Sequence, residues 1–230
     1  MKEVGENFST SGPENHGFSS LNSVSWNLNQ QEIYEIILER GEGKLSKDGA
    51  MVVETGIHTG RSAQDKFVVK ESANKDDIWW ENAKEMSEEN FNTLYKDMTD
   101  FSNNKDLFVQ DLYGGADLQY RLPTRIYTEY AWHSLFIQNL LITVKDEEKS
   151  AFDPEFIIID LPSFKADPNR HGSRSETIIA VNFAKKVVLI AGTSYAGEIK
   201  KSVFTMLNFL LPPKNIMPMH CSVYVGNEND

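Results

Sequence analysis

The chain has 230 residues, of which 40% are hydrophobic, so it can bury one sizeable core. Its 34 acidic residues outnumber the 23 basic ones, and the net charge of −11 argues against nucleic acid or an anionic membrane as a partner, because both would be repelled. The N-terminus lacks a signal-peptide pattern, the apolar runs are too short to span a bilayer, and the single cysteine, Cys221, cannot form an internal disulfide. We therefore expect a cytoplasmic protein that does not insert into membranes.

The first 23 residues differ in composition from the rest of the chain. They are rich in Ser, Gly, Asn and Glu and hold few large apolar side chains, so ordering them would cost more conformational entropy than their burial returns. We expect a mobile arm over residues 1–23 and one domain over residues 24–230.

Helical and strand patterns interleave after the arm. Asn29 and Glu32 have the spacing of a capping box, a stripe of isoleucines follows, and Gly41 ends the pattern, which predicts the first helix. Residues 81–98 and 129–141 are also predicted to be helical. Strands are predicted at residues 51–53, 67–69, 107–112, 156–159, 178–181 and 187–190. Several later strands are too close for a helix at every crossover, so we expect an α/β fold with a mixed β-sheet and flanking helices.

An apolar stripe predicts which face of the helix at residues 129–141 is buried. Trp132, Phe136 and Leu140 recur every four residues and should contact a core. His133 lies beside this stripe, and we interpret it as a hydrogen-bonded structural histidine. Arg125, a few residues earlier, offers positive potential to an anion site.

The segment Thr55–Ser62 places two glycines, an arginine and a serine between two predicted strands. Glycine permits a tight backbone that would present Arg61 at the sheet edge, and a guanidinium fork suits a carboxylate or a phosphate. The segment is not a G-x-x-x-x-G-K-[ST] phosphate-binding loop, because the lysine is absent and the spacing differs. From spacing alone, a connecting loop with a solvated arginine is an equally good interpretation.

A lysine pair and a histidine near the C-terminal end form a second candidate site. Lys200 and Lys201 precede a predicted helix at residues 204–211, and His220 is expected on the following strand. Lys201 can bind a metal only when its amine is neutral, and Lys200, a dication and burial would each lower its pKa. On pattern alone, the lysines are more often a solvated face and the histidine part of a core. A zinc site at His220 and Cys221 is disfavoured, since a closed zinc site needs further ligands.

Three groups of motifs resemble the ATP-dependent phosphoenolpyruvate carboxykinases. They are Thr-Gly-x-x-Thr-Gly-Arg-Ser at residues 55–62, Gly-Ala-Asp with Arg-x-x-Thr-Glu-x-Ala-Trp at residues 115–132, and Tyr-x-Gly-Glu-x-Lys-Lys followed by Met-His-Cys-Ser at residues 195–222. The resemblance covers nearly all of residues 25–230. It implies the fold of that family's N-terminal, substrate-binding domain.

The chain departs from the family's motifs at two places. Ala63 and Gln64 stand where Pro-Lys or Pro-Asn is usual, and Gly114 stands where cysteine is common. Neither position carries one of the implied contacts with substrate or metal.

The resemblance implies substrate contacts and catalytic residues. It implies that Arg61 binds the substrate's carboxylate and that Tyr195, Gly197 and Lys201 also contact the substrate. It implies catalytic roles for Arg61, Lys200 and Lys201, with Lys200 in the charged cavity.

The resemblance also implies a metal and a reaction. Lys201 and His220 would bind Mn2+ and contribute to the ATP site, with Mg2+ accompanying ATP. The implied reaction is the reversible conversion of oxaloacetate and ATP to phosphoenolpyruvate, CO2 and ADP, a step of gluconeogenesis.

The organisation of the family leads to a further expectation. Its phosphate-binding loop and adenine pocket would follow Asp230, so we expect an N-terminal portion that lacks the C-terminal nucleotide-binding domain and is inactive alone. Two other interpretations stay open. The chain could be a non-catalytic module that binds a dicarboxylate or a metal, or a structural half that assembles with a separately encoded chain.

Overall fold

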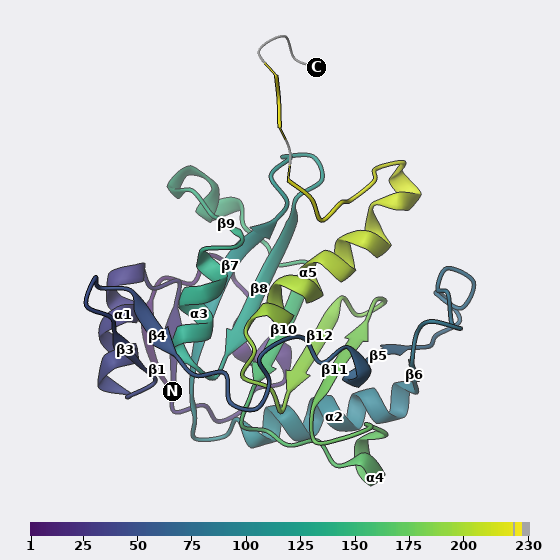
Figure 1. The fold of residues 1–230 in the computed structure, drawn as a ribbon, viewed down its shortest axis with the longest axis horizontal. Coiled ribbons are helices and arrows are strands. Elements are labelled where there is room, and N and C mark those ends of the chain that lie inside the picture. Colours follow the sequence, from purple (N-terminus) through teal and green to yellow (C-terminus); the bar gives the residue numbers. More distant parts are fainter. Residues whose placement is uncertain (223, 227–230) are drawn as a thin grey trace.

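A ten-stranded mixed β-sheet organises the fold (Figure 1). The structure is a computed structural model that describes residues 1–222 and 224–226, so residues 223 and 227–230 of the predicted domain lie outside it. Across the sheet the strands are β1 (Lys2–Gly5), β2 (Ser23–Trp26), β7 (Asp106–Gly114), β8 (Leu122–Thr128), β10 (Phe156–Leu161), β12 (Val187–Ala191), β11 (Ile178–Asn182), β5 (Lys66–Val69) and β6 (Glu85–Met86), with β9 (Ile142–Thr143) pairing with β7.

The strand pairs are of both kinds, which confirms the predicted α/β fold with a mixed sheet. The pairs β7–β8, β7–β9 and β11–β12 are antiparallel, and β8, β10 and β12 run parallel to one another. A separate hairpin joins β3 (Gly43–Leu45) and β4 (Met51–Val53). The helices are α1 (Gln30–Glu39), α2 (Glu88–Phe101), α3 (Ala131–Gln138), α4 (Pro168–His171) and α5 (Gly197–Leu210). Within the described ranges, no helix combines the length and apolarity needed to cross a membrane.

Helices cover both faces of the sheet, because alternate strand residues point to opposite sides. The face that packs against α2 receives, from β10 and β12, Ile157, Ile159, Val187 and Leu189. The face that packs against α5 receives the intervening residues Phe156, Ile158, Val188 and Ile190. Since both faces are buried, these strands are continuously apolar, as the sequence-based prediction required.

Residues 1–23 pack on the sheet, in contrast to the mobile arm expected from their composition. β1 pairs in parallel with β2, and Phe18 is buried in the core beside α2. The guanidinium of Arg125 donates to the Ser11 carbonyl and to Asn7 Oδ1, each at 2.7 Å. The entropy argument fails here because a few well-placed contacts, one of them to a buried cation, hold a segment that is otherwise polar.

His16 provides a direct test of this packed segment. Its ring lies 5.7 Å from that of Tyr127, centroid to centroid, and its Nε2 atom is buried without a hydrogen-bond partner among the described residues. Burial, and then the charge of Arg125, lower the pKa of His16 from 6.5 to about 4. We expect an NMR titration to give a pKa near 4 for this ring. A value near 6.5 would mean that the segment is not packed.

The same shift predicts a pH dependence of stability. Because the folded-state pKa of His16 is depressed, its contribution is complete above pH 6.5 and is lost as the pH falls toward 4. After allowance for solvent screening, this loss should amount to about 1–2 kcal/mol of the free energy of unfolding. His16→Phe should flatten the dependence of the free energy of unfolding on pH between pH 6.5 and about 4. His220→Phe, a matched change at an exposed histidine, should not flatten it.

The polar helix predicted at residues 81–98 is shorter at its start than expected. α2 begins at Glu88, because the Ser87 hydroxyl accepts a hydrogen bond from the amide of Asn90 at 3.1 Å and caps the helix. Glu85–Met86 forms the edge strand β6 instead, paired with β5.

α3 turns a different face inward from the predicted one. Trp132 is buried, but Phe136 and Leu140 are 37% and 41% exposed, and Leu135 and Ile137 are buried in their place. The helix lies between α1 and strand β7 and contacts both. Because α3 has neighbours on two sides, side chains outside a single i, i+4 stripe, such as Leu135 and Ile137, are buried as well.

Candidate functional site

The predicted site residues gather where β12 leads into α5. The connection turns at Gly192, whose φ is 73° and where a Cβ would collide with the backbone carbonyl of Glu176. Tyr195 then packs against Gly197, the first residue of α5, since a Cβ on Gly197 would lie 2.5 Å from the tyrosine ring. Glycine at 197 therefore allows the half-buried Tyr195 ring to approach the start of the helix.

Glu198 ties the loop at residues 55–62 to this helix. Its buried carboxylate accepts a hydrogen bond from the Ser62 amide at 2.7 Å. Burial raises the pKa of Glu198, while the Ser62 amide and the charge of Lys66 oppose that rise. This contact brings Arg61, the neighbour of Ser62, to the first turns of α5.

Three cations, Arg61, Lys66 and Lys201, share this junction. Burial, followed by the charges of Arg61 and Lys200, lowers the pKa of Lys201. Burial also lowers the pKa of Lys66, with Arg61 and Lys201 adding to the effect and Glu198 opposing it. Within the described part of the chain, none of these three cations has a carboxylate oxygen within 4.0 Å. The junction is thus a local positive site on an acidic protein, as an anionic ligand requires.

His58 lies in the loop at residues 55–62 and forms hydrogen bonds inside and outside that loop. The Thr177 hydroxyl donates its hydrogen to the Gly192 carbonyl at 2.9 Å, so it accepts from His58 Nε2 at 3.0 Å. The Nδ1 atom of the same ring lies 3.2 Å from the Ser62 hydroxyl, within hydrogen-bond distance. The imidazole thereby links the loop that carries Arg61 to the turn between β12 and α5.

His133 is a structural histidine, as predicted. It is fully buried, its Nδ1 hydrogen-bonds with Asp160, and its Nε2 donates to the Ser194 carbonyl at 3.1 Å. Burial raises the pKa of Asp160, and the charge of His133 opposes that rise. The pair therefore positions the backbone directly before Tyr195.

His220 does not lie on a strand, so that part of the prediction is wrong. A short turn at Pro212–Lys214 follows α5, and the described residues beyond it form no strand. His220 is exposed, and its ring lies 5.7 Å from that of Phe204, centroid to centroid. Lys201 Nζ lies 5.7 Å from the same ring centroid. Lys200 lines, with His220, a cavity of about 230 Å³.

Lys201 and His220 have some, but not all, of the features of a metal site. The described residues contain no group of three or more His, Cys, Asp or Glu side chains placed to hold a metal ion. The lowered pKa of Lys201 nevertheless favours the neutral amine that metal binding requires. The Lys201 amine and the His220 ring each lie 5.7 Å from the centroid of the Phe204 ring, so the two side chains have this neighbour in common.

Arg125 does not contribute potential to this site, contrary to expectation. It is fully buried, and its guanidinium forms a bidentate ion pair with Asp111 at 2.7 and 2.9 Å. The carboxylate neutralises its charge, and its remaining N–H groups bond to the N-terminal segment.

Three residues of the site have no role in the sequence-based prediction. These are His58, Lys66 and Glu198. Glu198 carries a signal that could have been used, because an acidic residue in the first turn of a helix, two positions before a lysine pair, can anchor a loop. His58 gives no such signal, since its partners are far away in the sequence or are hydroxyl groups of common residues.

Comparison with known proteins agrees with the motifs. A family described as phosphoenolpyruvate carboxykinase matches residues 22–230. Over 230 residues the chain is 57% identical to the "Phosphoenolpyruvate carboxykinase (ATP)" of Parvibaculum lavamentivorans, 54% to that of Methylobacterium sp. and 52% to that of Azorhizobium caulinodans. Each match covers 100% of this chain and 43% of the relative, so the chain spans less than half the length of these curated relatives. The family match extends over almost the whole chain, which therefore belongs to the ATP-dependent phosphoenolpyruvate carboxykinases.

Proposed function

We propose that this chain supplies the substrate- and metal-binding part of an enzyme that converts oxaloacetate and ATP to phosphoenolpyruvate, CO2 and ADP, a step of gluconeogenesis. The observation that carries the proposal is the junction of Arg61, Lys66 and Lys201, which Glu198 holds at the start of α5. Oxaloacetate and phosphoenolpyruvate are anions, and a chain with a net charge of −11 repels them except where cations gather.

Arg61 would hold the substrate's carboxylate. Its guanidinium is exposed, so both N–H edges of the fork are open to a ligand. Tyr195 and Gly197 would form the wall next to it, and Lys200 and Lys201 would add charge on the helix side. Because Ser62 is held by both Glu198 and His58, the loop would present Arg61 with little loss of conformational entropy on binding.

Lys201 and His220 would hold Mn2+, and both would also lie at the ATP site, where Mg2+ would accompany the nucleotide. When bound, Mn2+ supplies Lewis-acid stabilisation of negative charge on a substrate oxygen. Burial and the charges of Arg61 and Lys200 lower the pKa of Lys201, so its ammonium would give up a proton to a bound metal more readily than an isolated lysine would.

We also propose where the nucleotide is held and where the protein acts. No G-x-x-x-x-G-K-[ST] pattern occurs in the 230 residues, so residues outside this chain would position the phosphates of ATP. Residues 24–230 would then act as a substrate-binding domain that cannot transfer a phosphoryl group alone. A chain whose single cysteine cannot close an internal disulfide fits the cytoplasm.

Mn2+ binding tests the proposal on the chain itself. Lys201→Met and His220→Ala should each weaken the binding of Mn2+, measured by electron paramagnetic resonance, by about 10-fold or more. Lys185→Met is the matched control, since this exposed lysine bonds to Asn92 on α2, and it should leave the affinity unchanged. Affinity should rise with pH, because both ligands must lose a proton to bind. Equal affinities in the three variants would contradict the metal role.

Turnover separates the proposal from its alternatives. We expect the chain to bind phosphoenolpyruvate and Mn2+ without forming phosphoenolpyruvate from oxaloacetate and ATP. Formation of that product by the purified chain would refute the assignment of ATP to residues outside it. Turnover gained on adding a second polypeptide with a phosphate-binding loop would exclude a module that only binds.

A further inference from the structure

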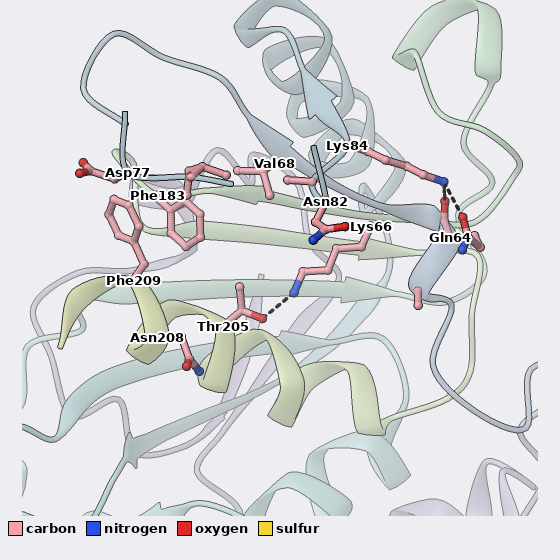
Figure 2. Close-up of a pocket in the computed structure, with 13 residues that line it drawn as sticks. Gln64, Lys66, Val68, Asp77, Asn82, Lys84, Phe183, Thr205, Asn208 and Phe209 are labelled. Carbon is pink, nitrogen blue, oxygen red and sulfur yellow. Dashed lines mark hydrogen bonds between the residues drawn. The ribbon is translucent and has the colours of Figure 1, made fainter. Parts of the chain in front are cut away.

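A second cavity lies beside α5; it shares Lys66 with the cationic junction, but none of the side chains proposed above to contact the substrate or the metal lines it. It has a volume of about 430 Å³, within the usual range for sites that bind small molecules. Strand β5, the loop before β6 and the outer face of α5 surround it (Figure 2). Arg61, Tyr195, Gly197, Lys201 and His220 are all absent from its lining.

The polar lining of this cavity includes the ammonium group of Lys66. Lys66 Nζ donates to Thr205 Oγ1 at 2.5 Å, and that hydroxyl donates its own hydrogen to the Lys201 carbonyl at 2.8 Å. An ammonium has three N–H donors, and the described residues offer Lys66 no other hydrogen-bond partner. Two donors are therefore open to a ligand.

Among the described residues no carboxylate pairs directly with Lys66, although the charge of Glu198 partly opposes the lowering of its pKa. Within the described part of the chain, no carboxylate oxygen lies within 4.0 Å of its amine. Asp77 also lines the cavity, but its carboxylate points away from Lys66 (Figure 2). Burial lowers the pKa of Lys66, which reflects the cost of a cation in this place. A bound anion would offset that cost.

The other end of the cavity is aromatic. Phe183 and Phe209 stack with ring centroids 4.1 Å apart and an interplanar angle of 17°. Val68 and Ile78 extend the apolar wall. Figure 2 shows the two rings on one side of the Lys66 amine, so the cavity offers an apolar surface and a cation to the same ligand.

The second lysine of the lining is already engaged. Lys84 Nζ bonds to the backbone carbonyl and to the side chain of Gln64, the latter at 3.0 Å (Figure 2). Lys84 keeps its charge but uses two of its three N–H donors on Gln64, so among the described lining residues Lys66 is the cation with more donors open to a carboxylate.

We propose that this cavity binds a small aromatic carboxylate, with its ring against Phe183 and Phe209 and its carboxylate on Lys66. The site is distinct from the one proposed for oxaloacetate, and the proposal does not depend on that function.

Benzoate is the probe, and benzamide is its neutral counterpart of the same shape. In 15N–1H spectra of the full 230-residue chain, benzoate should shift the amides around Phe183 and Phe209, with a Kd of about 1 mM for a ligand of this size. Benzamide should bind at least about 5-fold more weakly, because it lacks the charge that Lys66 meets. Equal binding of the two would overturn the proposal without any substitution.

Substitutions locate the site. Lys66→Met, which keeps the apolar stem, should weaken benzoate binding by about 10-fold or more, and Phe209→Ala should also weaken it. Lys84→Met is the matched control and should change the Kd by less than about 2-fold. Unchanged affinity in Lys66→Met would overturn the proposal.

Competition distinguishes this cavity from the proposed substrate site. Phosphoenolpyruvate should not displace benzoate, and Arg61→Gln should leave benzoate binding intact. Loss of benzoate binding in Arg61→Gln, with no effect of Phe209→Ala, would place the probe at the substrate site and refute the second site. Because benzoate and phosphoenolpyruvate are titrated separately, failure of one site leaves the test of the other unaffected.

Discussion

Arg61→Gln is expected to weaken the binding of phosphoenolpyruvate to the chain by about 10- to 100-fold, measured by isothermal titration calorimetry. The substitution removes the exposed fork while the loop that carries it stays attached through Ser62, whose amide bonds to Glu198. Glutamine keeps polarity and much of the length but supplies neither the charge nor two parallel N–H groups. The change should therefore act on ligand binding and leave the stability of the chain nearly unaltered.

Two further variants make this result specific. Arg61→Lys retains the charge without the planar fork, so it should bind with an affinity between those of the wild type and Arg61→Gln. Arg170→Gln removes another exposed arginine, which pairs with Asp97 on α2, and should leave phosphoenolpyruvate binding unchanged. If Arg170→Gln weakened binding as much as Arg61→Gln, the effect would be one of net charge, and the loop would not be a substrate site.

The sequence predicted the centre of the fold better than its edges. The apolar runs at residues 156–159, 178–181 and 187–190 lie within β10, β11 and β12, because strands buried on both faces must be continuously apolar. The edge strands β1 and β6 were not predicted. They are short and polar, and they exist only because a neighbouring strand pairs with them, which no local pattern reveals.

The site was predicted through motifs, and its assembly was not. The sequence motifs identified Arg61 and Lys201 as site residues. The segments that carry them are joined by a hydrogen bond between Ser62 and Glu198, which are 136 positions apart, so no motif predicts it. Arg125 was misjudged for the same reason. Its buried partner, Asp111, is opposite it on the neighbouring strand, and only the register of β7 with β8 shows that its charge is neutralised.

Arg125→Met should be the most destabilising of the changes considered, with a loss of about 3–5 kcal/mol in the free energy of unfolding, measured by urea denaturation. The guanidinium is fully buried, forms a bidentate pair with Asp111, and lies 4.9 Å from the centre of the Trp26 ring. Methionine would fill much of the volume but leave the Asp111 carboxylate buried without its cation. That uncompensated charge, more than any lost attraction, is the source of the expected effect.

Removing both charges should restore part of the loss. In the double variant Asp111→Asn/Arg125→Met the buried carboxylate is gone, the amide oxygen that replaces it can accept from Asn27 Nδ2, and the backbone amide of residue 111 still donates to Asn27 Oδ1. We therefore expect the double variant to be more stable than Arg125→Met alone, which a double-mutant cycle would report as a coupling of about 1–3 kcal/mol. A double variant as unstable as the single one would mean that the lost contacts to the N-terminal segment, and not the stranded carboxylate, account for the effect.

The contacts of Arg125 with the N-terminal segment can be measured separately from its pairing with Asp111. Arg125 holds the Ser11 carbonyl and Asn7, so Arg125→Met should increase hydrogen exchange across residues 2–18 in both the single and the double variant. The pKa of His16 should then rise from about 4 toward 6.5, because the charge of Arg125 is gone and release of the segment exposes the imidazole to water; hydrogen exchange reports the release separately. Restored stability together with a released segment would show that one guanidinium performs two separable tasks: it neutralises a buried carboxylate, and it fastens the N-terminal residues to the sheet. If the segment instead stayed protected in both variants, its attachment would rest on its other contacts, among them β1 and Phe18.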